Sequence, residues 1–377
     1  MSLWACDLTD VANGVRTPGA TGVGKGRTRA EARLRALCEA LERHLSGPAA
    51  IGATAVHFAG AEKLADGPLA REASAPLLRK MHGSKLLCHT YRALHPGHKD
   101  AAVPLYLGAP WYAGDEGRNH RIRLGDRTDY RALSRYSVSS GYGLAPTEDQ
   151  ATVHALLETV ERDACSLLTI RTLLLGRAPT GLDPRTLPGD LATLHTEAQR
   201  EAGAPVHLID ATNDLNVPTV LAYAAPREGH AHLRGQASSL TAYDAVAGAL
   251  AELLECAVAR RHTPPAPACL DALKPYPALH RCARFDLTDV LAQMTATAYR
   301  DQPPQANAGP MAGANAGAQL DELLARLSAR GFTAYRRHLA ALPGEVSAVH
   351  TVVPGLERFF AVVKGALILP GQRGQTC

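Results

Sequence analysis

Apolar residues recur every three or four positions in three long stretches of the sequence, at residues 27–45, 147–174 and 241–261. This spacing places them on one side of a helix, so the pattern predicts three amphipathic α-helices. The second helix also carries a start signal, because Thr147 is followed three residues later by Gln150, the spacing of a capping box. In the first helix we expect the core-facing side to consist of Leu34, Leu37, Cys38, Leu41 and Leu45.

Shorter segments rich in β-branched and aromatic residues predict strands at residues 205–210, 217–225, 347–354 and 359–369. Another helical pattern covers residues 320–330. It follows residues 299–318, which are rich in Gly, Pro, Ala and Asn and predict a long mobile loop. Helical and strand-like segments therefore alternate along the chain, which predicts an α/β fold.

The composition is that of a globular protein with a sizeable core, since 46% of the 377 residues are hydrophobic and 20% are charged. The net charge is +4, from 40 basic and 36 acidic residues without a basic block, which argues against nucleic-acid binding. No apolar run approaches the ~20 residues of a membrane-spanning helix, and no secretory signal opens the sequence. The eight cysteines form no C-x-x-C pair. We therefore expect a cytoplasmic protein with no membrane or nucleic-acid partner.

The motif Glu-x-x-Glu-Arg occurs on two of the predicted helices. Residues three apart are neighbours on a helix, so each motif holds two like charges that are costly to bury without a cation. Two such helices placed face to face would gather four carboxylates, a set of hard oxygen ligands that suits Mg²⁺ bridging to a phosphate. The alternative is an ordinary charged helix surface, and the spacing alone leaves both open. The four residues are Glu39, Glu42, Glu158 and Glu161.

A longer spacing links all three long helices: each carries Ala, six residues, Glu, two residues and Glu, with the third copy at Ala245, Glu252 and Glu255. We interpret the match as helices with a common task rather than as a repeat protein. Other motifs are weaker. The loop at residues 22–28 lacks the spacing of a Walker-A phosphate loop, and no G-x-S-x-G elbow or Cys/His pair marks a nucleophile. No catalytic residue can be assigned from the residues alone.

Taken together, these segments resemble the YcaO family. The resemblance rests above all on the two Glu-x-x-Glu-Arg helices, and the similar segments occur in family order over most of the chain. They are GKGRTRAEARLRALCEALER (residues 24–43), SSGYGLAPTEDQATVHALLETVERDA (139–164), DATNDLNVPTV (210–220), AVAGALAELLECAVAR (245–260) and VVPGL (352–356).

The resemblance implies a single domain over residues 1–377 with the YcaO-type fold, in which mixed sheets pack with amphipathic helices that converge on a central nucleotide and metal site. It implies that ATP and Mg²⁺ are used to activate a backbone amide of a ribosomally made peptide, giving an azoline such as thiazoline, a thioamide or an amidine. By position, the family's metal ligands are Glu39, Glu42, Glu158 and Glu161, and its basic nucleotide residues are Arg162 and Arg260.

Five positions depart from the family pattern while all four glutamates remain. A serine, a serine, an asparagine, a glutamate and a glutamine usually stand, in this order, where the sequence has Arg35, Gly143, Pro146, Gln150 and Cys256. Arg35 lies one turn before Glu39, so we expect the two side chains to pair. The hypothesis that follows is altered or lost ATP binding, with the charge of Arg35 replacing part of the metal's charge.

The retained glutamates and the five departures favour different functions. The retained glutamates favour an enzyme of ribosomal peptide natural product biosynthesis, similar to a cyclodehydratase or a thioamide-forming enzyme. The departures favour a degenerate relative that serves as a scaffold or partner subunit, or that catalyses a reaction without ATP. In either case we expect a precursor peptide and a separate protein that recognises its leader or activates the enzyme, and a homodimer is compatible with the sequence.

Overall fold

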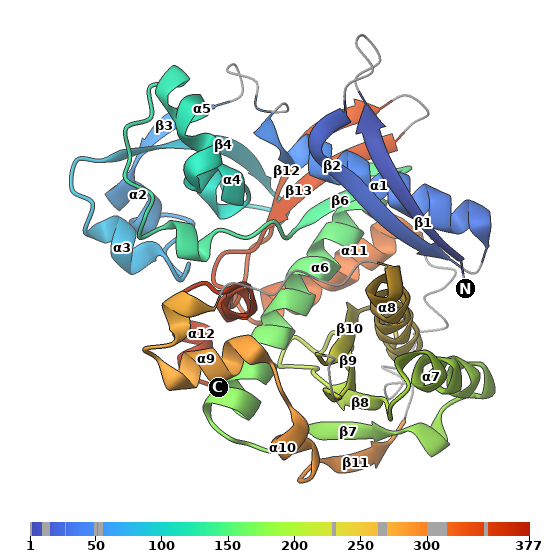
Figure 1. Cartoon of the computed structure of the whole chain (residues 1–377). Coiled ribbons are helices and arrows are strands. Elements are labelled where there is room, and N and C mark those ends of the chain that lie inside the picture. The colour runs from blue at the N-terminus through green and yellow to red at the C-terminus, as the bar shows by residue number, and fades with distance from the viewer. Residues whose placement is uncertain are drawn as a thin grey trace. The chain divides into compact units, whose positions relative to one another are not determined.

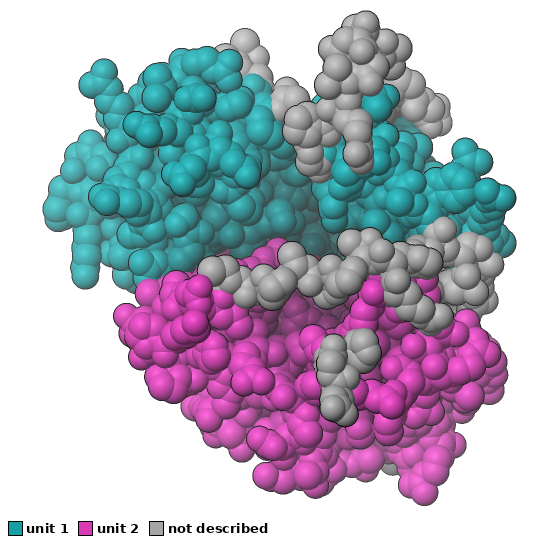
Figure 2. Space-filling model, in the orientation of Figure 1, with its two compact units in different colours: residues 1–159, 327–356 teal, residues 160–326, 357–377 magenta. Residues whose placement is uncertain are grey.

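The structure is a computed structural model (Figure 1) that describes residues 2–9, 16–26, 28–48, 51, 56–227, 231–262, 270–299, 315–342 and 346–377. Contacts within the chain define two compact units (Figure 2). The first comprises Met1–Thr159 and Leu327–Leu356, and the second comprises Val160–Arg326 and Glu357–Cys377. The single domain expected from the resemblance stays a prediction. Most of the predicted loop at residues 299–318 lies outside the described residues.

The first unit contains a hairpin, a helix packed on it, and a six-stranded sheet. Strand β1 (Ser2–Thr9) pairs antiparallel with β2 (Arg16–Gly26), and α1 (Arg29–Ser46) packs on β2. The sheet has the order β3-β4-β12-β13-β6, and β5 also pairs with β4. Its strands are β3 (His57–Gly60), β4 (Lys85–Ala93), β5 (Ala101–Pro104), β6 (Tyr142–Ala145), β12 (Tyr335–Leu342) and β13 (Val346–Val352).

Short helices cover the chain between β3 and β6 and help to form the core of the first unit. Leu78, Tyr106 and Tyr112, which come from these helices and turns, are completely buried in a core that also contains residues of β4 and β5. The helices are α2 (Ala61–Asp66), α3 (Ala75–Arg79), α4 (Pro110–Ala113) and α5 (Arg118–Arg123). The 3₁₀ turns are Leu105–Leu107, Asp115–Gly117 and Ser134–Tyr136. The long helix α6 (Glu148–Thr169) begins in this unit and continues into the second.

The second unit is built on a five-stranded sheet of order β10-β9-β8-β7-β11, antiparallel except for the parallel pair β7 and β11. Helix α8 packs on β9 and β10, and α7 packs on α8 (Figure 1). The strands are β7 (Thr180–Asp183), β8 (His207–Asp210), β9 (Thr219–Ala224), β10 (Leu233–Ser238) and β11 (Thr295–Ala298). The helices are α7 (Gly189–Ala202), α8 (Ala242–His262), α9 (Pro277–Arg284), α10 (Thr288–Leu291), α11 (Ala316–Ala329) and α12 (Gln372–Gln375). A π-helical turn, Ile170–Leu174, and the 3₁₀ segments Pro184–Thr186, Asp271–Leu273 and Phe359–Lys364 complete the unit.

The structure confirms the predicted long helices and most of the predicted strands. Helices α1, α6, α8 and α11 and strands β8, β9 and β13 lie at the expected places. The strand predicted at residues 359–369 is wrong, because Phe359–Lys364 forms a 3₁₀ helix that ends at Gly365 with a φ of 84°. A left-handed residue directly after the apolar run stops an extended strand there.

The predicted core-facing side of α1 is also wrong. Leu34 and Leu37 are 61% and 41% exposed, whereas Ala32, Ala36 and Ala40 are completely buried. The glycine-rich strand β2 approaches so closely that only alanine fits between the two backbones. Periodicity thus located the helix, while the size of the side chains decided which side is buried. The described cysteines are free thiols, and none of the helices in the described ranges is both long and apolar enough to cross a membrane.

Candidate functional site

The first carboxylate pair lies on α1, whose start is fixed by a side-chain cap. Thr28 Oγ1 accepts a hydrogen bond from the backbone N–H of Glu31 (3.2 Å), the usual contact of a threonine N-cap. Further along the helix, Glu39 Oε2 accepts a hydrogen bond from the backbone N–H of Val23 on β2 (2.6 Å), and Arg43 Nη2 donates to Oε1 (2.5 Å). Glu39 therefore ties the helix to the strand, and Arg43 neutralises part of its charge.

Glu42, the second member of this pair, has a carboxyl group whose pKa lies well above the usual value. Burial and the negative charges of Glu158 and Glu39 raise the pKa of the Glu42 carboxyl from 4.5 to about 8. A hydrogen bond from the backbone of Leu144 and the charge of Arg43 act in the other direction but do not offset these effects. The first unit thus holds three carboxyl groups at a place where an additional positive charge would be favourable.

The first glutamate of the second pair also binds the backbone that precedes its helix. Glu158 Oε2 accepts a hydrogen bond from the N–H of Gly141 (2.9 Å), whose φ of 89° favours glycine. Strand β6 follows at once and runs against α6. A Cβ atom on Gly143 would lie 2.1 Å from the carbonyl oxygen of Ala151, so a larger residue could not occupy this position without a shift of the backbone.

The third helix repeats this construction in the second unit. Glu252 Oε2 accepts a hydrogen bond from the backbone N–H of Gln236 on β10 (2.6 Å). A Cβ atom on Gly235 would lie 2.2 Å from the carbonyl oxygen of Ala249, which matches the close approach at β6. In all three copies, the first glutamate of the pair therefore anchors the backbone that precedes the helix. The repeated spacing seen in the sequence has a structural cause, and Glu39 and Glu158 combine this anchoring with their position beside Glu42.

The remaining predicted site residues lie in the second unit. Glu161 and Arg162, in the second half of α6, form an ion pair (3.4 Å). Arg260 on α8 donates from Nη2 to the carbonyl oxygens of Ala231 (2.7 Å) and His232 (2.8 Å). The structure therefore brings Glu39, Glu42 and Glu158 together within the first unit. The clamp of four glutamates, and the roles of Arg162 and Arg260 toward a nucleotide, stay predictions.

The donor set of the first unit is chemically suited to Mg²⁺. Within the described residues, no group of three or more His, Cys, Asp or Glu side chains is already close enough to hold a metal ion. The interacting groups at Glu42 are the carboxylates of Glu39 and Glu158, and carboxylate oxygens are ligands that Mg²⁺ prefers. Their mutual repulsion at Glu42 would be relieved by a divalent cation, and binding would require the Glu42 carboxyl to lose its proton.

The expected pairing of Arg35 with Glu39 is wrong. Arg35 Nη2 binds Glu31 Oε1 (2.9 Å), one turn toward the start of the helix. Glu39 is already bound by Arg43 on its other side, where a cation toward the helix C-terminus is favoured. The charge of Arg35 is therefore directed away from the carboxylates, and the proposed replacement of the metal's charge by Arg35 loses its geometric basis.

The other departures have local explanations or are exposed. Gln150 and Thr147 form the predicted capping box, in which each side chain binds the other's backbone N–H (3.3 and 3.2 Å). Gly143 is required by the contact of β6 with α6. Pro146 and Cys256 are both exposed. These substitutions fit the local packing of the chain and do not place a group that blocks the carboxylates of the first unit.

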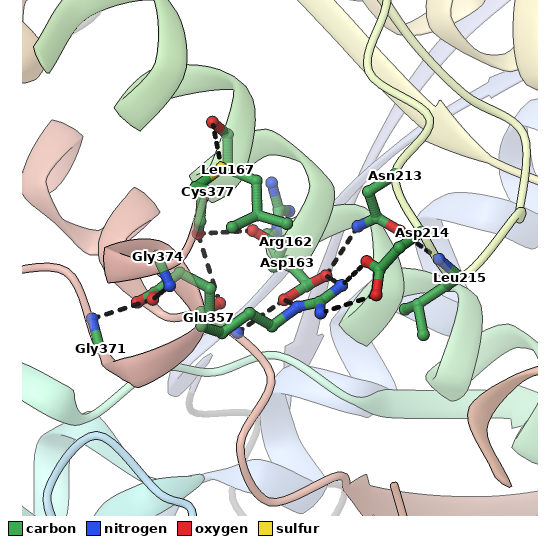
Figure 3. Close-up of polar contacts among 12 residues, drawn as sticks. Arg162, Asp163, Leu167, Asn213, Asp214, Leu215, Glu357, Gly371, Gly374 and Cys377 are labelled. Carbon is green, nitrogen blue, oxygen red and sulfur yellow. Dashed lines mark hydrogen bonds and ion pairs between the residues drawn. The ribbon is translucent and has the colours of Figure 1, made fainter. Parts of the chain in front are cut away.

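A buried ion-pair network that no motif of the sequence indicated lies beside Arg162 (Figure 3). Asp163 has no exposed surface and accepts two hydrogen bonds from Arg373, at 2.8 Å from Nε and 3.0 Å from Nη2. The side-chain amide of Asn213 and the backbone N–H of Glu357 each donate to the same carboxylate (2.7 Å). Arg373 also binds Asp214 (2.5 Å). The aspartate follows the Glu-x-x-Glu-Arg motif directly, but its partner is 210 residues away, so no local pattern could reveal the pair.

Glu357 extends this network toward the end of the chain (Figure 3). Its carboxylate oxygen Oε2 accepts hydrogen bonds from the backbone N–H groups of Gly371 and Gly374, both at 2.9 Å. The Sγ atom of Cys377 lies 4.0 Å from the carbonyl oxygen of Leu167 on α6. The segment around α12 is thus tied to α6 directly after Arg162, which fixes the course of the helix at the residue the sequence placed near the nucleotide.

Comparisons with known proteins identify relatives over almost the whole chain. A family profile described as YcaO cyclodehydratase, ATP- and Mg²⁺-binding, matches residues 23–357. No curated protein matches the sequence significantly. Among solved structures, the YcaO protein of Methanopyrus kandleri, bound to AMPPCP and Mg²⁺, is similar with a TM-score of 0.63 and 20% identity, over 96% of this chain and 86% of that one.

Two further structures show the same fold. A heterocyclase in complex with substrate and cofactor has a TM-score of 0.63 and 14% identity and matches 90% of this chain, which spans 46% of that protein's length. The microcin synthetase McbBCD complex of E. coli has a TM-score of 0.62 and 13% identity, over 91% of this chain and 84% of the matched one. At these identities, the structural likeness establishes the fold expected from the sequence.

Proposed function

The chain belongs to the YcaO family, and from that membership we propose that it is an enzyme that uses ATP and Mg²⁺ to activate a backbone amide of a peptide. An amide oxygen is a poor leaving group, and phosphorylation after nucleophilic attack turns it into a good one. The family profile, which is described by ATP and Mg²⁺ binding, and the relative bound to AMPPCP and Mg²⁺ support this cofactor pair.

The observation that supports the proposal most strongly is the raised pKa of the Glu42 carboxyl beside two other carboxylates. A carboxyl with its pKa raised to about 8 by burial and by two neighbouring carboxylates is costly in the protein alone. The cost is removed when a divalent cation supplies the missing positive charge. A helix that had only a structural task would not need a third carboxyl here, because Glu39 and Glu158 already provide the two anchoring hydrogen bonds.

Each group of the chain has a distinct task in this proposal. Glu42, Glu158 and Glu161 would bind the ion through carboxylate oxygens, with Glu39 contributing while it holds β2 in place. Mg²⁺ bound to the phosphates would offset the negative charge that develops during phosphoryl transfer. Arg162 and Arg260, as positively charged groups, would orient the nucleotide, and the buried Asp163 beside Arg162 limits the movement of this part of α6.

The substrate we propose is a ribosomally made peptide that a separate partner protein presents. Cysteine, serine or threonine as the attacking group gives an azoline, sulfide gives a thioamide, and an amine gives an amidine. Relatives described as a heterocyclase with bound substrate and as a microcin synthetase complex bound to pro-MccB17 favour azoline formation on a peptide within a complex of proteins.

A degenerate scaffold without ATP chemistry is not favoured. Four glutamates of the family pattern are present, and the departures at Gly143 and Gln150 serve packing and helix capping. Arg35, the substitution that suggested a replaced metal, binds Glu31. At these three positions, the departures from the family pattern therefore have local structural reasons and do not indicate loss of the nucleotide site.

The proposal is tested by incubating the protein with a candidate precursor peptide, its partner protein and Mg-ATP, and by measuring the peptide's mass. We expect a loss of one water for an azoline, the exchange of oxygen for sulfur for a thioamide, and ADP formation that depends on the peptide. Glu42→Gln removes the charge and should abolish the change, while the exposed Glu31→Gln on the same helix should leave it intact. An unchanged peptide and no ATP consumption, with precursor and partner shown to bind, would overturn the proposal.

A further inference from the structure

The guanidinium of Arg234 in the second unit is partly buried and lies against aromatic rings. Arg234 lies on β10, and its Nη1 atom is buried without a hydrogen-bond partner among the described residues. Its closest ring neighbours are Phe285 and Phe360, whose ring centres lie 4.6 and 4.9 Å from the guanidinium carbon. Both phenylalanines are buried. Aromatic faces attract a cation but cannot accept the directed hydrogen bonds that five guanidinium N–H groups offer.

A second arginine lies against the same aromatic cluster. The guanidinium of Arg162 is 5.8 Å from the ring centre of Phe360. Burial lowers the pKa of Arg234, and the positive charge of Arg162 lowers it further, although Glu252 acts in the opposite direction. The Oε2 atom of Glu252 accepts a hydrogen bond from the backbone N–H of Gln236 (2.6 Å). Two cations therefore lie near one ring, and the buried Nη1 atom of one of them has no hydrogen-bond partner in the described part of the chain.

Other positive groups extend this region toward α8. Arg260 binds the carbonyl oxygen of His232, two residues before Arg234 on the chain. Burial lowers the pKa of the His232 imidazole to about 4, and the charges of Arg234 and Arg260 contribute to the decrease. The imidazole is thus neutral at physiological pH, and the positive charge of this region comes from the arginines. Among the residues that the structure describes, the Nη1 atom of Arg234 has no acceptor, so an anion would find a donor there.

We propose that Arg234, together with Arg162, forms an anion subsite of this protein that binds a phosphate of a polyphosphate. This inference rests on the proposed use of ATP and adds a residue that the family pattern of the sequence did not include. Arg234 would also supply a fork of N–H donors near Cys256, the position that lacks the usual glutamine. A guanidinium that is already desolvated and held by two aromatic rings binds a phosphate oxygen with little further loss of hydration or side-chain freedom.

The experiment compares wild type, Arg234→Met and Arg234→Lys in calorimetric titrations with Mg-ATP and, separately, with inorganic tripolyphosphate, alongside thermal unfolding without ligand. Loss of one charged hydrogen-bonding group predicts about 10- to 100-fold weaker binding of both probes by Arg234→Met. Its melting temperature without ligand should stay or rise, because an apolar side chain replaces a buried unpaired charge. Arg234→Lys keeps the charge without the fork and should bind with intermediate affinity. Arg281→Met is the control, since Arg281 is an exposed arginine of the same unit whose Nε donates to the carbonyl oxygen of Leu173 (2.9 Å).

The outcomes separate this subsite from the function it rests on. Unchanged binding by both Arg234 variants, with binding by the wild type intact, overturns the subsite and leaves the ATP proposal standing. Binding of tripolyphosphate but not of Mg-ATP, lost in Arg234→Met, supports the subsite and overturns the nucleotide proposal. Binding of neither probe by the wild type overturns both. If Arg234→Met is unfolded and Arg234→Lys binds as the wild type does, the residue is structural and the subsite is refuted.

Discussion

Replacing Glu42 by glutamine removes a negative charge and keeps the shape of the side chain. The pKa of the Glu42 carboxyl is raised from 4.5 to about 8, so the folded protein holds this proton more tightly than the unfolded chain. The corresponding stability is present below about pH 4.5 and is lost as the pH rises through 8. The wild type should therefore lose stability over this range, whereas Glu42→Gln should not.

The expected size of this effect follows from the same pKa values. A pKa difference of one unit corresponds to about 1.4 kcal/mol, so the increase from 4.5 to about 8 sets an upper limit of about 5 kcal/mol on the change in unfolding free energy. Glu42 is only partly buried by surface area, and residual hydration weakens the repulsion. We therefore expect Glu42→Gln to be more stable than the wild type by about 1–3 kcal/mol at about pH 9, and nearly equal to it at about pH 5.

The assay is urea unfolding at about pH 5, 7 and 9, followed by circular dichroism and compared through the transition midpoints. Glu31→Gln is the matched control, because Glu31 lies on the same helix in an exposed pair with Arg35. Its effect should stay below about 1 kcal/mol at every pH. Equal pH profiles for the wild type and Glu42→Gln, or a less stable Glu42→Gln protein at about pH 9, would refute the reasoning.

Two further predictions concern the packing around α6. Gly143→Ser restores the residue usual in the family but should destabilise the protein by about 1–3 kcal/mol or more, because its Cβ would lie 2.1 Å from the Ala151 carbonyl oxygen. Thermal unfolding measures this, with Gly189→Ser as the control in open space, and a stable Gly143→Ser protein would show that β6 is not held against α6. Arg373→Met leaves the buried Asp163 carboxylate without its main partner and should cost about 3–5 kcal/mol. Adding Asp163→Asn should recover part of that loss in urea unfolding, and a loss that is the same in both backgrounds would contradict a direct ion pair.

The helices could be predicted from the sequence because their signals are local. Apolar periodicity, the capping box of Thr147 and Gln150 and the Glu-x-x-Glu-Arg spacing each involve residues within one or two helical turns. The same local information gave the wrong side of α1, because the side that faces the core depends on how closely the glycines of β2 approach it. Arg35 likewise has a glutamate one turn away in each direction, and only the hydrogen bond from Val23 and the contact with Arg43 show that Glu39 is already engaged.

The parts of the site that could not be predicted depend on residues far apart in the chain. Asp163 and Arg373 are 210 residues apart, and neither belongs to a motif that would link them. Arg234 lies in a polar stretch of the sequence, and only the buried Nη1 atom of its guanidinium beside two phenylalanine rings distinguishes it. The glutamates were found because their spacing repeats, yet the sequence could not show that one glutamate of each pair also anchors the preceding backbone.

We propose above all that the carboxylates on α1 and α6 bind Mg²⁺ with ATP. The most direct measurement of this binding is isothermal titration calorimetry of ATP into the wild type, Glu42→Gln and Glu31→Gln, with and without Mg²⁺. We expect Mg²⁺-dependent binding by the wild type and by Glu31→Gln, and binding by Glu42→Gln that is weaker by about tenfold or more. Wild-type binding that is absent, that does not require Mg²⁺, or that Glu42→Gln retains in full would contradict it.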